Sequence, residues 1–221
     1  MISPLYVFDI CGTIFKSNTT FDFLTFWLTP RSKYYSSFDK LRKTFIWKVI
    51  NKITRTYFHV DITRVIALRF LKGYSRLQLL EGADMFYESY LIKHINDYVV
   101  GKLKELIDNP SCNVLIASAT IDVVAEVIAR KMQILDWYSS ELCYVDGICQ
   151  GKLSKDLLGK KNDFIQEIQN QTIDSVYTDD FTDIPLLKEA RQKNIVVYPK
   201  TDKKRKKIVK KMKWNVNFIE Y

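Results

Sequence analysis

The sequence predicts an α/β fold in which a parallel sheet carries a large helical insertion. Four short apolar segments have the length and composition of buried strands, and they lie at 4–9, 113–118, 173–180 and 194–199. Helical patterns follow the second and third segments, and strands that alternate with helices are typical of βα units. Between the first two segments, residues 19–108 show helical spacing and almost no strand pattern.

The inserted region is predicted to contain several helices. In L-R-K-T-F-I-W-K-V-I-N-K-I (41–53), apolar residues recur with the spacing of one helix face. Gly73 is expected to end a helix, and Ser75 is suited to cap the next one. Together the helical patterns cover 21–28, 41–53, 59–73, 75–90 and about 96–107.

The second half of the chain alternates strands with helices. Helical patterns follow the strands at 120–132 and 183–191. On such a sheet, ligands bind beyond the carboxyl ends of the strands. Asp9, Ser118 and Asp179 all stand at strand ends. We therefore expect these three residues to meet at one edge of the sheet.

The residues at these strand ends are suited to phosphoryl transfer. Asp9 and Asp179 would provide the oxygen ligands that Mg²⁺ prefers, and Asp183 would lie one turn further on and complete the metal shell. An Asp at a strand end is also a plausible nucleophile for phosphorus. Ser118, with a helix N-terminus behind it, and a lysine near residue 160 would bind the phosphoryl oxygens.

The net charge of +9 is unevenly distributed. Residues 200–213 carry +8 and residues 31–55 carry +7, which leaves −6 on the rest of the chain. Basic segments of this kind either bind anionic lipid, nucleic acid or an anionic substrate, or are solvated helix faces. Nucleic acid is the weaker option here, because the exposed part of the C-terminal segment lacks interleaved aromatic residues.

The cysteines and the apolar runs bear on the cellular compartment. The four cysteines are scattered without a C-x-x-C pair, which argues against a zinc site or a disulfide framework and favours a reducing compartment. No secretory signal pattern is seen, and no run approaches the roughly 18 apolar residues of a membrane span. We therefore expect a cytoplasmic protein.

Four motifs give the chain a resemblance to a known superfamily. The first motif, D-x-D-G-T, is matched by D-I-C-G-T (9–13). The second, an apolar strand that ends in Ser or Thr, is matched by V-L-I-A-S-A-T (114–120). A third, G-D-S-x-x-D followed by an apolar pair, is matched by T-D-D-F-T-D-I-P-L-L (178–187). The fourth motif is a lysine in L-L-G-K-K-N-D-F-I, where Lys161 fits better than Lys160 because of the position of Ile165. The chain resembles the haloacid dehalogenase superfamily, close to the phosphoserine phosphatases and phosphatidylglycerophosphate phosphatases.

The resemblance implies a fold and a set of roles. It implies a Rossmann-like core, formed by residues 1–18 and 109–221, and an inserted α-helical cap of the C1 type over residues 19–108. Asp9 would attack phosphorus and bind Mg²⁺, the backbone carbonyl of Cys11 and the carboxylate of Asp179 would be further ligands, and Ser118 and Lys161 would hold the phosphoryl oxygens. The basic C-terminus would form a surface helix and a last strand.

Cys11 departs from the family pattern. Relatives that are phosphatases have a second Asp here, which protonates the leaving group and then activates water. A thiol is a poorer acid and base for these steps, and losing a positioned acid–base group typically costs about 10²–10⁴-fold in rate. The sequence therefore leaves three options open: a phosphatase with another proton source, an impaired protein that binds a phosphorylated ligand or partner, or a phosphotransferase whose acceptor is not water.

The cap sequence bears on substrate and location. K-S-N-T-T-F-D-F-L (16–24) lacks the glutamate with which phosphoserine phosphatases read the substrate amino group, so phosphoserine is not the expected substrate. Aromatic residues at 21–47 combine with the +7 charge, which suits either a membrane interface or the cap's own core. We expect a small or lipid- or glycan-linked phosphomonoester, and a cytoplasmic protein with peripheral contact at the inner face of an anionic membrane.

Overall fold

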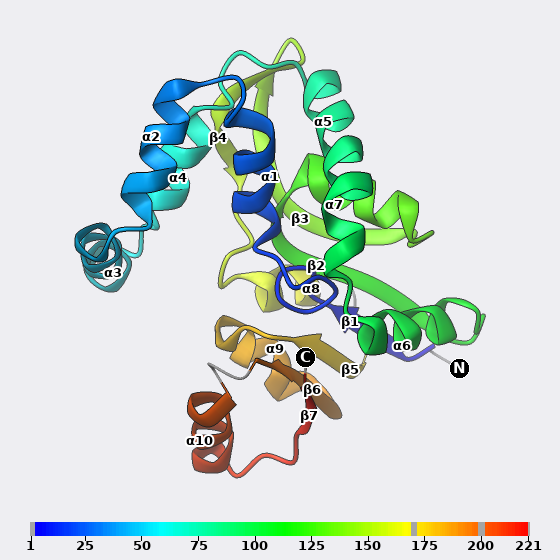
Figure 1. The fold of residues 1–221 in the computed structure, drawn as a ribbon. Coiled ribbons are helices and arrows are strands. Elements are labelled where there is room, and N and C mark those ends of the chain that lie inside the picture. Colours follow the sequence, from blue (N-terminus) through cyan, green and yellow to red (C-terminus); the bar gives the residue numbers. More distant parts are fainter. Residues whose placement is uncertain (1–2, 169–171, 199–201, 221) are drawn as a thin grey trace.

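The computed structural model describes residues 3–168, 172–198 and 202–220. They form an α/β core with one sheet of seven strands in the order β4-β3-β2-β1-β5-β6-β7 (Figure 1). Neighbouring strands are parallel except for the antiparallel pair β3–β4. The strands are β1 (Leu5–Phe8), β2 (Asn113–Ile121), β3 (Asp136–Val145), β4 (Ile148–Lys155), β5 (Ile173–Thr178), β6 (Gln192–Val197) and β7 (Asn217–Glu220).

Helices cover both faces of the sheet and build the cap. The helices are α1 (Thr19–Leu28), α2 (Lys33–Arg42), α3 (Phe45–Phe58), α4 (Ile62–Arg69), α5 (Arg76–Ser89), α6 (Asp97–Ile107), α7 (Asp122–Lys131), α8 (Lys161–Ile168), α9 (Ile184–Glu189) and α10 (Asp202–Met212), with 3₁₀ turns η1 (Leu91–His94) and η2 (Phe181–Asp183). The predicted α/β fold with a parallel sheet and a helical insertion is therefore confirmed.

Side chains that alternate along the strands form two hydrophobic cores, one on each face of the sheet. On β1, Phe8 packs in a cluster with α6, α7 and the cap, whereas Leu5 and Val7 pack in a second cluster with α8, α9 and α10. Successive side chains of a strand point to opposite faces, so a strand covered on both sides must be apolar throughout. This requirement explains the continuous apolar runs at 113–118 and 194–197.

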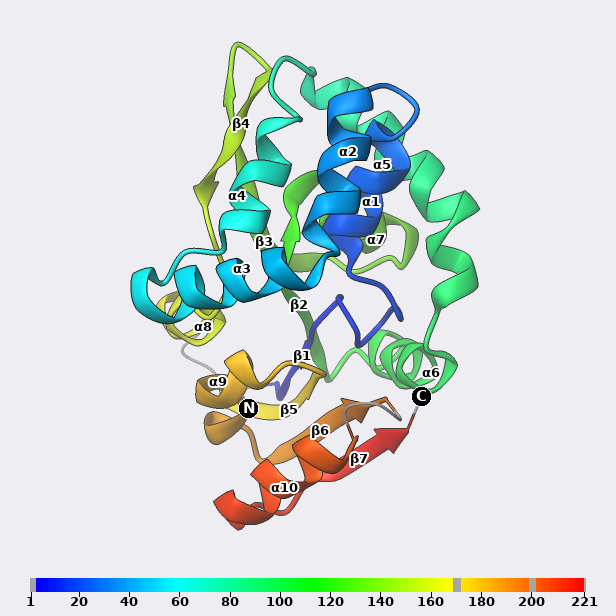
Figure 2. The ribbon, with the colours of Figure 1, turned by 60° about the vertical axis from the view of Figure 1, so that its left-hand side comes forward.

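The strand order places β1 at the centre of the sheet. The chain moves from β1 to β2 and β3 on one side, and later from β5 to β6 and β7 on the other (Figure 2). β1 therefore lies at the topological switch point, where the carboxyl ends of neighbouring strands leave room for a ligand.

The cap is a cluster of helices above the sheet, next to the β3–β4 hairpin (Figure 1). Its interior is formed by apolar side chains of α1, α2, α4 and α5, including Phe23, Trp27, Phe38, Leu68 and Phe86. Helix α6 packs against β2 of the sheet, although the predicted cap extends to residue 108. The division of the chain into 1–18 with 109–221 and 19–108 remains a prediction.

Several predicted helices have different limits in the structure. The predicted helix at 41–53 is interrupted, because α2 ends at Arg42 and Thr44 caps α3 by accepting a hydrogen bond from the backbone N–H of Trp47 at 3.3 Å. The predicted helix at 59–73 is also shorter, since His59 has a left-handed conformation that ends α3 and α4 begins at Ile62. Ser75 caps α5 as predicted, within a capping box.

Aromatic residues of the first cap helices divide between interior and surface. Phe23 and Trp27 are buried in the cap, and Phe21, Phe26 and Trp47 are partly buried against it, as the interpretation of a cap core requires. Phe45, in contrast, is 81% exposed. The cap-core interpretation is therefore confirmed for most of these aromatic residues, and the membrane-interface interpretation stays a prediction.

Two helical glycines allow a test of cap packing. A Cβ on Gly82 of α5 would lie 2.6 Å from Cε3 of Trp27, whereas a Cβ on Gly101 of α6 would meet nothing within 4 Å. The Trp27 ring has little room to move, because it contacts the Tyr74 ring and the Arg31 guanidinium. We expect Gly82→Ala to lower the free energy of unfolding by roughly 0.5–2 kcal/mol, since overpacking outweighs the gain in helix propensity.

Gly101→Ala is the matched control, because it makes the same change without a clash. We expect it to raise the free energy of unfolding by roughly 0.5–1 kcal/mol. Urea denaturation of both variants measures the difference. Equal stabilisation by the two substitutions would contradict the close packing of α5 on Trp27.

Candidate active site

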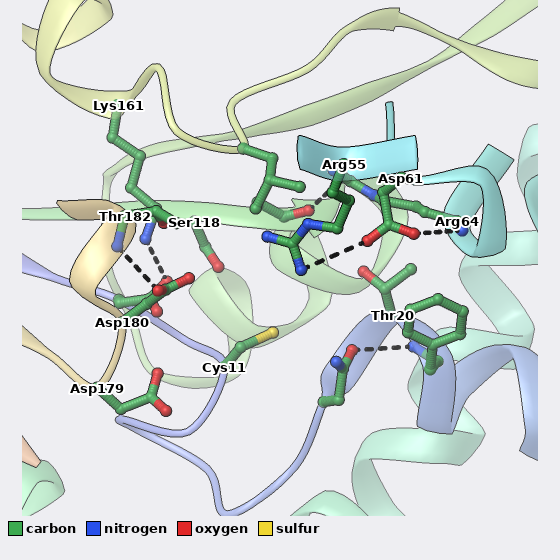
Figure 3. Close-up of a pocket in the computed structure, with 15 residues that line it drawn as sticks. Cys11, Thr20, Arg55, Asp61, Arg64, Ser118, Lys161, Asp179, Asp180 and Thr182 are labelled. Carbon is green, nitrogen blue, oxygen red and sulfur yellow. Dashed lines mark hydrogen bonds and ion pairs between the residues drawn. The ribbon is translucent and has the colours of Figure 1, made fainter. Parts of the chain in front are cut away.

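A cavity opens at the carboxyl ends of β1, β2 and β5 (Figure 3). Its lining includes five of the six site residues predicted from the sequence, Asp9, Cys11, Ser118, Lys161 and Asp179, but not Asp183. They come from three neighbouring strands and from the start of α8. The sheet topology therefore brings together residues that are up to 170 positions apart in the chain.

Lys161 is the charged centre of the site. Its ammonium Nζ lies 2.9 Å from Oδ1 of Asp9 and 2.8 Å from Oδ2 of Asp183, and the side chain is only 4% exposed. Burial by itself would lower the pKa of Lys161, but Asp183 and Asp9 outweigh it and raise the pKa above its usual range. Lys161 therefore carries a fixed positive charge. Lys160 is exposed and lies outside this cavity.

Asp9 is a buried carboxyl with an unusual titration. Burial raises its pKa to about 7, with Asp183 and Asp179 adding to the rise and Lys161 opposing it. Apart from the contact with Lys161, Oδ1 of Asp9 has no hydrogen bond with any described residue. The carboxyl group is thus left available for a ligand.

Asp183 contacts the lysine and a strand hydroxyl. Its Oδ2 accepts hydrogen bonds from Nζ of Lys161 at 2.8 Å and from Oγ1 of Thr178 at 2.6 Å. The residue is 2% exposed, and its Oδ1 has no hydrogen-bond partner among the described residues. Asp183 therefore orients Lys161, and its place in the metal shell remains a prediction.

Gly12 permits the close approach of Asp179 to the first loop. A Cβ at this position would lie 2.4 Å from Cγ of Asp179, and the residue has φ of +65°, which other residues rarely adopt. The Tyr198 hydroxyl donates a hydrogen bond to the Gly12 carbonyl at 2.6 Å and steadies the loop. The glycine of D-I-C-G-T is therefore required on both steric and conformational grounds.

Arg205 of α10 lies against Asp179. Its Nη2 is 3.0 Å from Oδ2 of Asp179, and its Nη1 donates to the Val196 carbonyl at 2.6 Å. Burial raises the pKa of Asp179 to about 6, and Arg205 opposes that rise. The sequence analysis missed this residue, since it is an arginine within a run of lysines whose position depends on how α10 returns to the sheet.

Cys11 belongs to a cluster of hydroxyl groups. Its Sγ lies 2.9 Å from Oγ1 of Thr19 and 3.2 Å from Oγ1 of Thr120, and these two hydroxyls are 2.6 Å apart. Oγ of Ser118 is 3.0 Å from the Thr120 hydroxyl. Burial, and then the charge of Asp9, raise the pKa of the Cys11 thiol. The thiol is therefore protonated at neutral pH and is a weak acid.

Arg64 of the cap contacts the core beside the cavity. It is 6% exposed, its Nη1 lies 2.6 Å from Oδ1 of Asp156, and its Nη2 donates to the Ala119 carbonyl at 2.6 Å. Ala119 follows Ser118 directly, so this arginine holds a cap helix on the strand that carries the serine. Sequence reasoning missed it, because neither partner lies near it in the chain.

The residues of the site fit a magnesium ion by donor type. Asp9 is buried and Asp179 is partly buried at neighbouring strand ends, burial raises the pKa of both carboxyl groups, and a bound cation would favour their charged forms. Over the described ranges, no group of three or more His, Cys, Asp or Glu side chains is arranged to hold a metal ion. The predicted ligand set, Asp9, Asp179, Asp183 and the Cys11 carbonyl, therefore stays a prediction.

Comparisons with known proteins decide the family. Residues 6–188 match the family model of the haloacid dehalogenase-like hydrolases. The chain belongs to this family. No curated protein matches the chain. The predicted family and the enzyme class are thereby confirmed, and the roles of the individual residues remain predictions.

Solved structures of low sequence identity share the fold. A protein of unknown function from Bordetella pertussis Tohama I has a TM-score of 0.77 at 14% identity, covering 98% of this chain and 99% of its own. A cytosolic 5′-nucleotidase IIIB bound to cytidine has a TM-score of 0.68 at 12% identity, with 99% and 80% covered. A substrate-bound phosphoserine phosphatase has a TM-score of 0.59 at 15% identity, with 95% and 98% covered.

The helices give one further result. Among the residues that the structure describes, no helix is both long enough and apolar enough to cross a membrane.

The ion pair between Arg205 and Asp179 leads to a prediction about Mg²⁺ affinity. Its guanidinium would repel a cation bound at the same carboxylate, so we expect Arg205→Gln to bind Mg²⁺ on the order of tenfold more tightly than the wild type, as measured by titration calorimetry. Lys210→Gln, an exposed change of equal charge on the same helix, is the control and should leave the affinity within about twofold. Unchanged or weaker binding in Arg205→Gln would show that Arg205 does not compete with the ion.

Proposed function

We propose that the chain is a Mg²⁺-dependent phosphatase that forms an aspartyl-phosphate on Asp9. The observation that carries the proposal is the buried arrangement of Asp9, Lys161 and Asp183 beside Asp179, at the switch point of the sheet. The family is one of hydrolases, and its structural neighbours include phosphatases, which supports phosphoryl hydrolysis in general.

Each residue has a role in the proposed reaction. The carboxylate of Asp9 attacks phosphorus, and the bond to the leaving oxygen breaks as the acyl phosphate forms. Lys161 and the Ser118 hydroxyl hold the phosphoryl oxygens, and Asp183 keeps the lysine oriented. Asp9, Asp179 and the Cys11 carbonyl would hold Mg²⁺, which neutralises charge on the transferring group. Water then hydrolyses the acyl phosphate.

The substrate in this proposal is a small or lipid- or glycan-linked phosphomonoester. The absence of the glutamate after the first motif argues against phosphoserine, although a phosphoserine phosphatase is among the structural neighbours. Arg64 is engaged with Asp156 and Ala119, and Arg55, a second cap cation in the cavity lining, lies 3.9 Å from Oδ2 of Asp61. It lies opposite Asp179 across the cavity and would face the leaving group (Figure 3).

Cys11 supports a second candidate function. A protonated thiol with a raised pKa, already engaged with two threonine hydroxyls, is poorly suited to accept a proton from water. The acyl phosphate would then persist until a different acceptor arrives, or the protein would act by binding a phosphorylated ligand or partner. The alternative is therefore a phosphotransferase with a non-water acceptor or an impaired relative.

The nucleophile is tested by Asp9→Asn. We expect this variant to lose Mg²⁺-dependent phosphate release from a panel of phosphomonoesters by at least about 10³-fold, because an amide cannot form the acyl phosphate. Acid quenching should also trap covalent phosphate on the wild type and none on the variant. Asp163→Asn, an exposed acid on α8, is the control. Activity of Asp9→Asn within about tenfold of the wild type would exclude Asp9 as the nucleophile.

The proton-transfer step is tested at Cys11. If the thiol limits turnover, Cys11→Asp should raise the steady-state rate by about 10²–10⁴-fold and shorten the lifetime of trapped phosphate. Cys11→Ser, which restores no carboxylate, should give no such gain. Fast turnover by the wild type that Cys11→Asp leaves unchanged would instead mean that another group supplies the proton, and would remove the second candidate.

A further inference from the structure

Helix α3 shows an apolar face to solvent. All of α3 lies in the described part of the chain, and none of its residues is buried. In amphipathic surface helices the apolar stripe normally faces the protein core. Here the exposed stripe consists of Phe45, Ile46, Val49, Ile50, Ile53 and Tyr57, and it is 81% exposed at Phe45, 72% at Ile46 and 74% at Tyr57.

The rotation of α3 is fixed by its contacts with α4. Nε1 of Trp47 donates a hydrogen bond to Oγ1 of Thr63 at 2.8 Å, and Oδ1 of Asn51 accepts one from the Thr63 backbone N–H at 3.0 Å. At 100° per residue, Trp47 and Asn51 lie on one side of the helix and the apolar residues span about 140° on another side. Trp47 and Asn51 thus make the contacts of α3 with α4, and the apolar arc points outward.

A basic edge borders the apolar arc. Lys48, Lys52 and Arg55 lie on one flank of α3, and the helix contains no acidic residue. The segment 31–55 carries +7, and its single acid, Asp39, is already paired with Arg42 and Lys43 at 2.6 Å each. An exposed apolar arc with lysines at its edge is the pattern of helices that lie in a membrane interface.

We propose that α3 docks on an anionic phospholipid bilayer, with its apolar arc in the headgroup region and its basic edge on lipid phosphates. A second copy of the chain would fit the surface less well. Two α3 helices packed together would bring like charges close without an acid on either helix to pair them, whereas anionic lipid neutralises them. A helix of 14 residues is about 21 Å long, enough to lie along the interface.

Helix α3 adjoins the cavity of the candidate active site. Arg55 and Asp61, at and just after the end of α3, line the cavity that holds Asp9 and Lys161. Helix α3 also lies at the outer edge of the cap in both views (Figures 1 and 2). The docking itself requires no catalysis, so it can be measured independently of the proposed reaction.

The test is co-sedimentation of the full chain with phosphatidylcholine vesicles, with and without phosphatidylglycerol. We expect at least about tenfold stronger binding to the anionic vesicles at low salt, and release as the salt concentration rises. The double variant Ile46→Ser/Ile53→Ser should weaken binding by at least about tenfold. Lys48→Gln/Lys52→Gln should weaken it by about fivefold for each lysine and reduce the salt dependence.

Matched controls separate α3 from other surfaces. Leu77→Ser and Leu135→Ser make the same kind of change at exposed apolar residues elsewhere and should bind as the wild type does. Lys207→Gln/Lys210→Gln/Lys211→Gln tests the basic helix α10. All substituted residues are exposed or lie on the solvent side of their helix, so thermal unfolding should stay near that of the wild type.

Three results would overturn the proposal. The first is wild-type protein that ignores anionic vesicles. The second is binding that survives both α3 variants but is lost in the α10 variant, which would assign the surface to α10. The third is a dimer, seen by analytical ultracentrifugation, that Ile46→Ser/Ile53→Ser dissociates while vesicle binding is absent; α3 would then be an interface between copies.

Discussion

The buried ammonium group of Lys161 is the interaction on which the site depends. Without an acidic partner, the ammonium group of Lys161, at 4% exposure, would be strongly destabilising. Breaking a buried ion pair typically costs about 3–5 kcal/mol. Asp9 and Asp183 provide the compensating charges, from the end of β1 and from η2 after β5. Three separate parts of the chain must therefore meet at one point for the core to be stable, and that point is the candidate active site.

The cap is joined to this point by polar contacts rather than by apolar packing alone. Arg64 binds the backbone beside Ser118, and the Thr19 hydroxyl contacts the Thr120 hydroxyl at 2.6 Å. The same hydroxyl cluster holds the Cys11 thiol, where the family pattern has a carboxylate. A second carboxylate there would lie close to Asp9, whose pKa is already raised by burial and by neighbouring acids. The thiol avoids that repulsion and loses a proton carrier.

Much of the fold and part of the site could be predicted from local patterns. The strands β1, β2, β5 and β6, the capping of α5 by Ser75 and the family motifs all follow from residues that are close in sequence. The antiparallel β3–β4 pair was not predicted, because its residues alternate irregularly and β4 has little apolar content. Arg64 and Arg205 were also missed, since their acidic or carbonyl partners lie 9 to 92 residues away.

The sequence by itself determined which chemistry is available: two strand-end aspartates, a serine, a lysine, and a cysteine in place of an acid. Only the tertiary structure decided how these groups are charged and which surface is open. The pKa values of Asp9 and Cys11 depend on burial, which no local pattern specifies. The apolar spacing of 45–57 is likewise the same whether a helix faces a core or the solvent. The contacts of Trp47 and Asn51 with Thr63 turn that face outward.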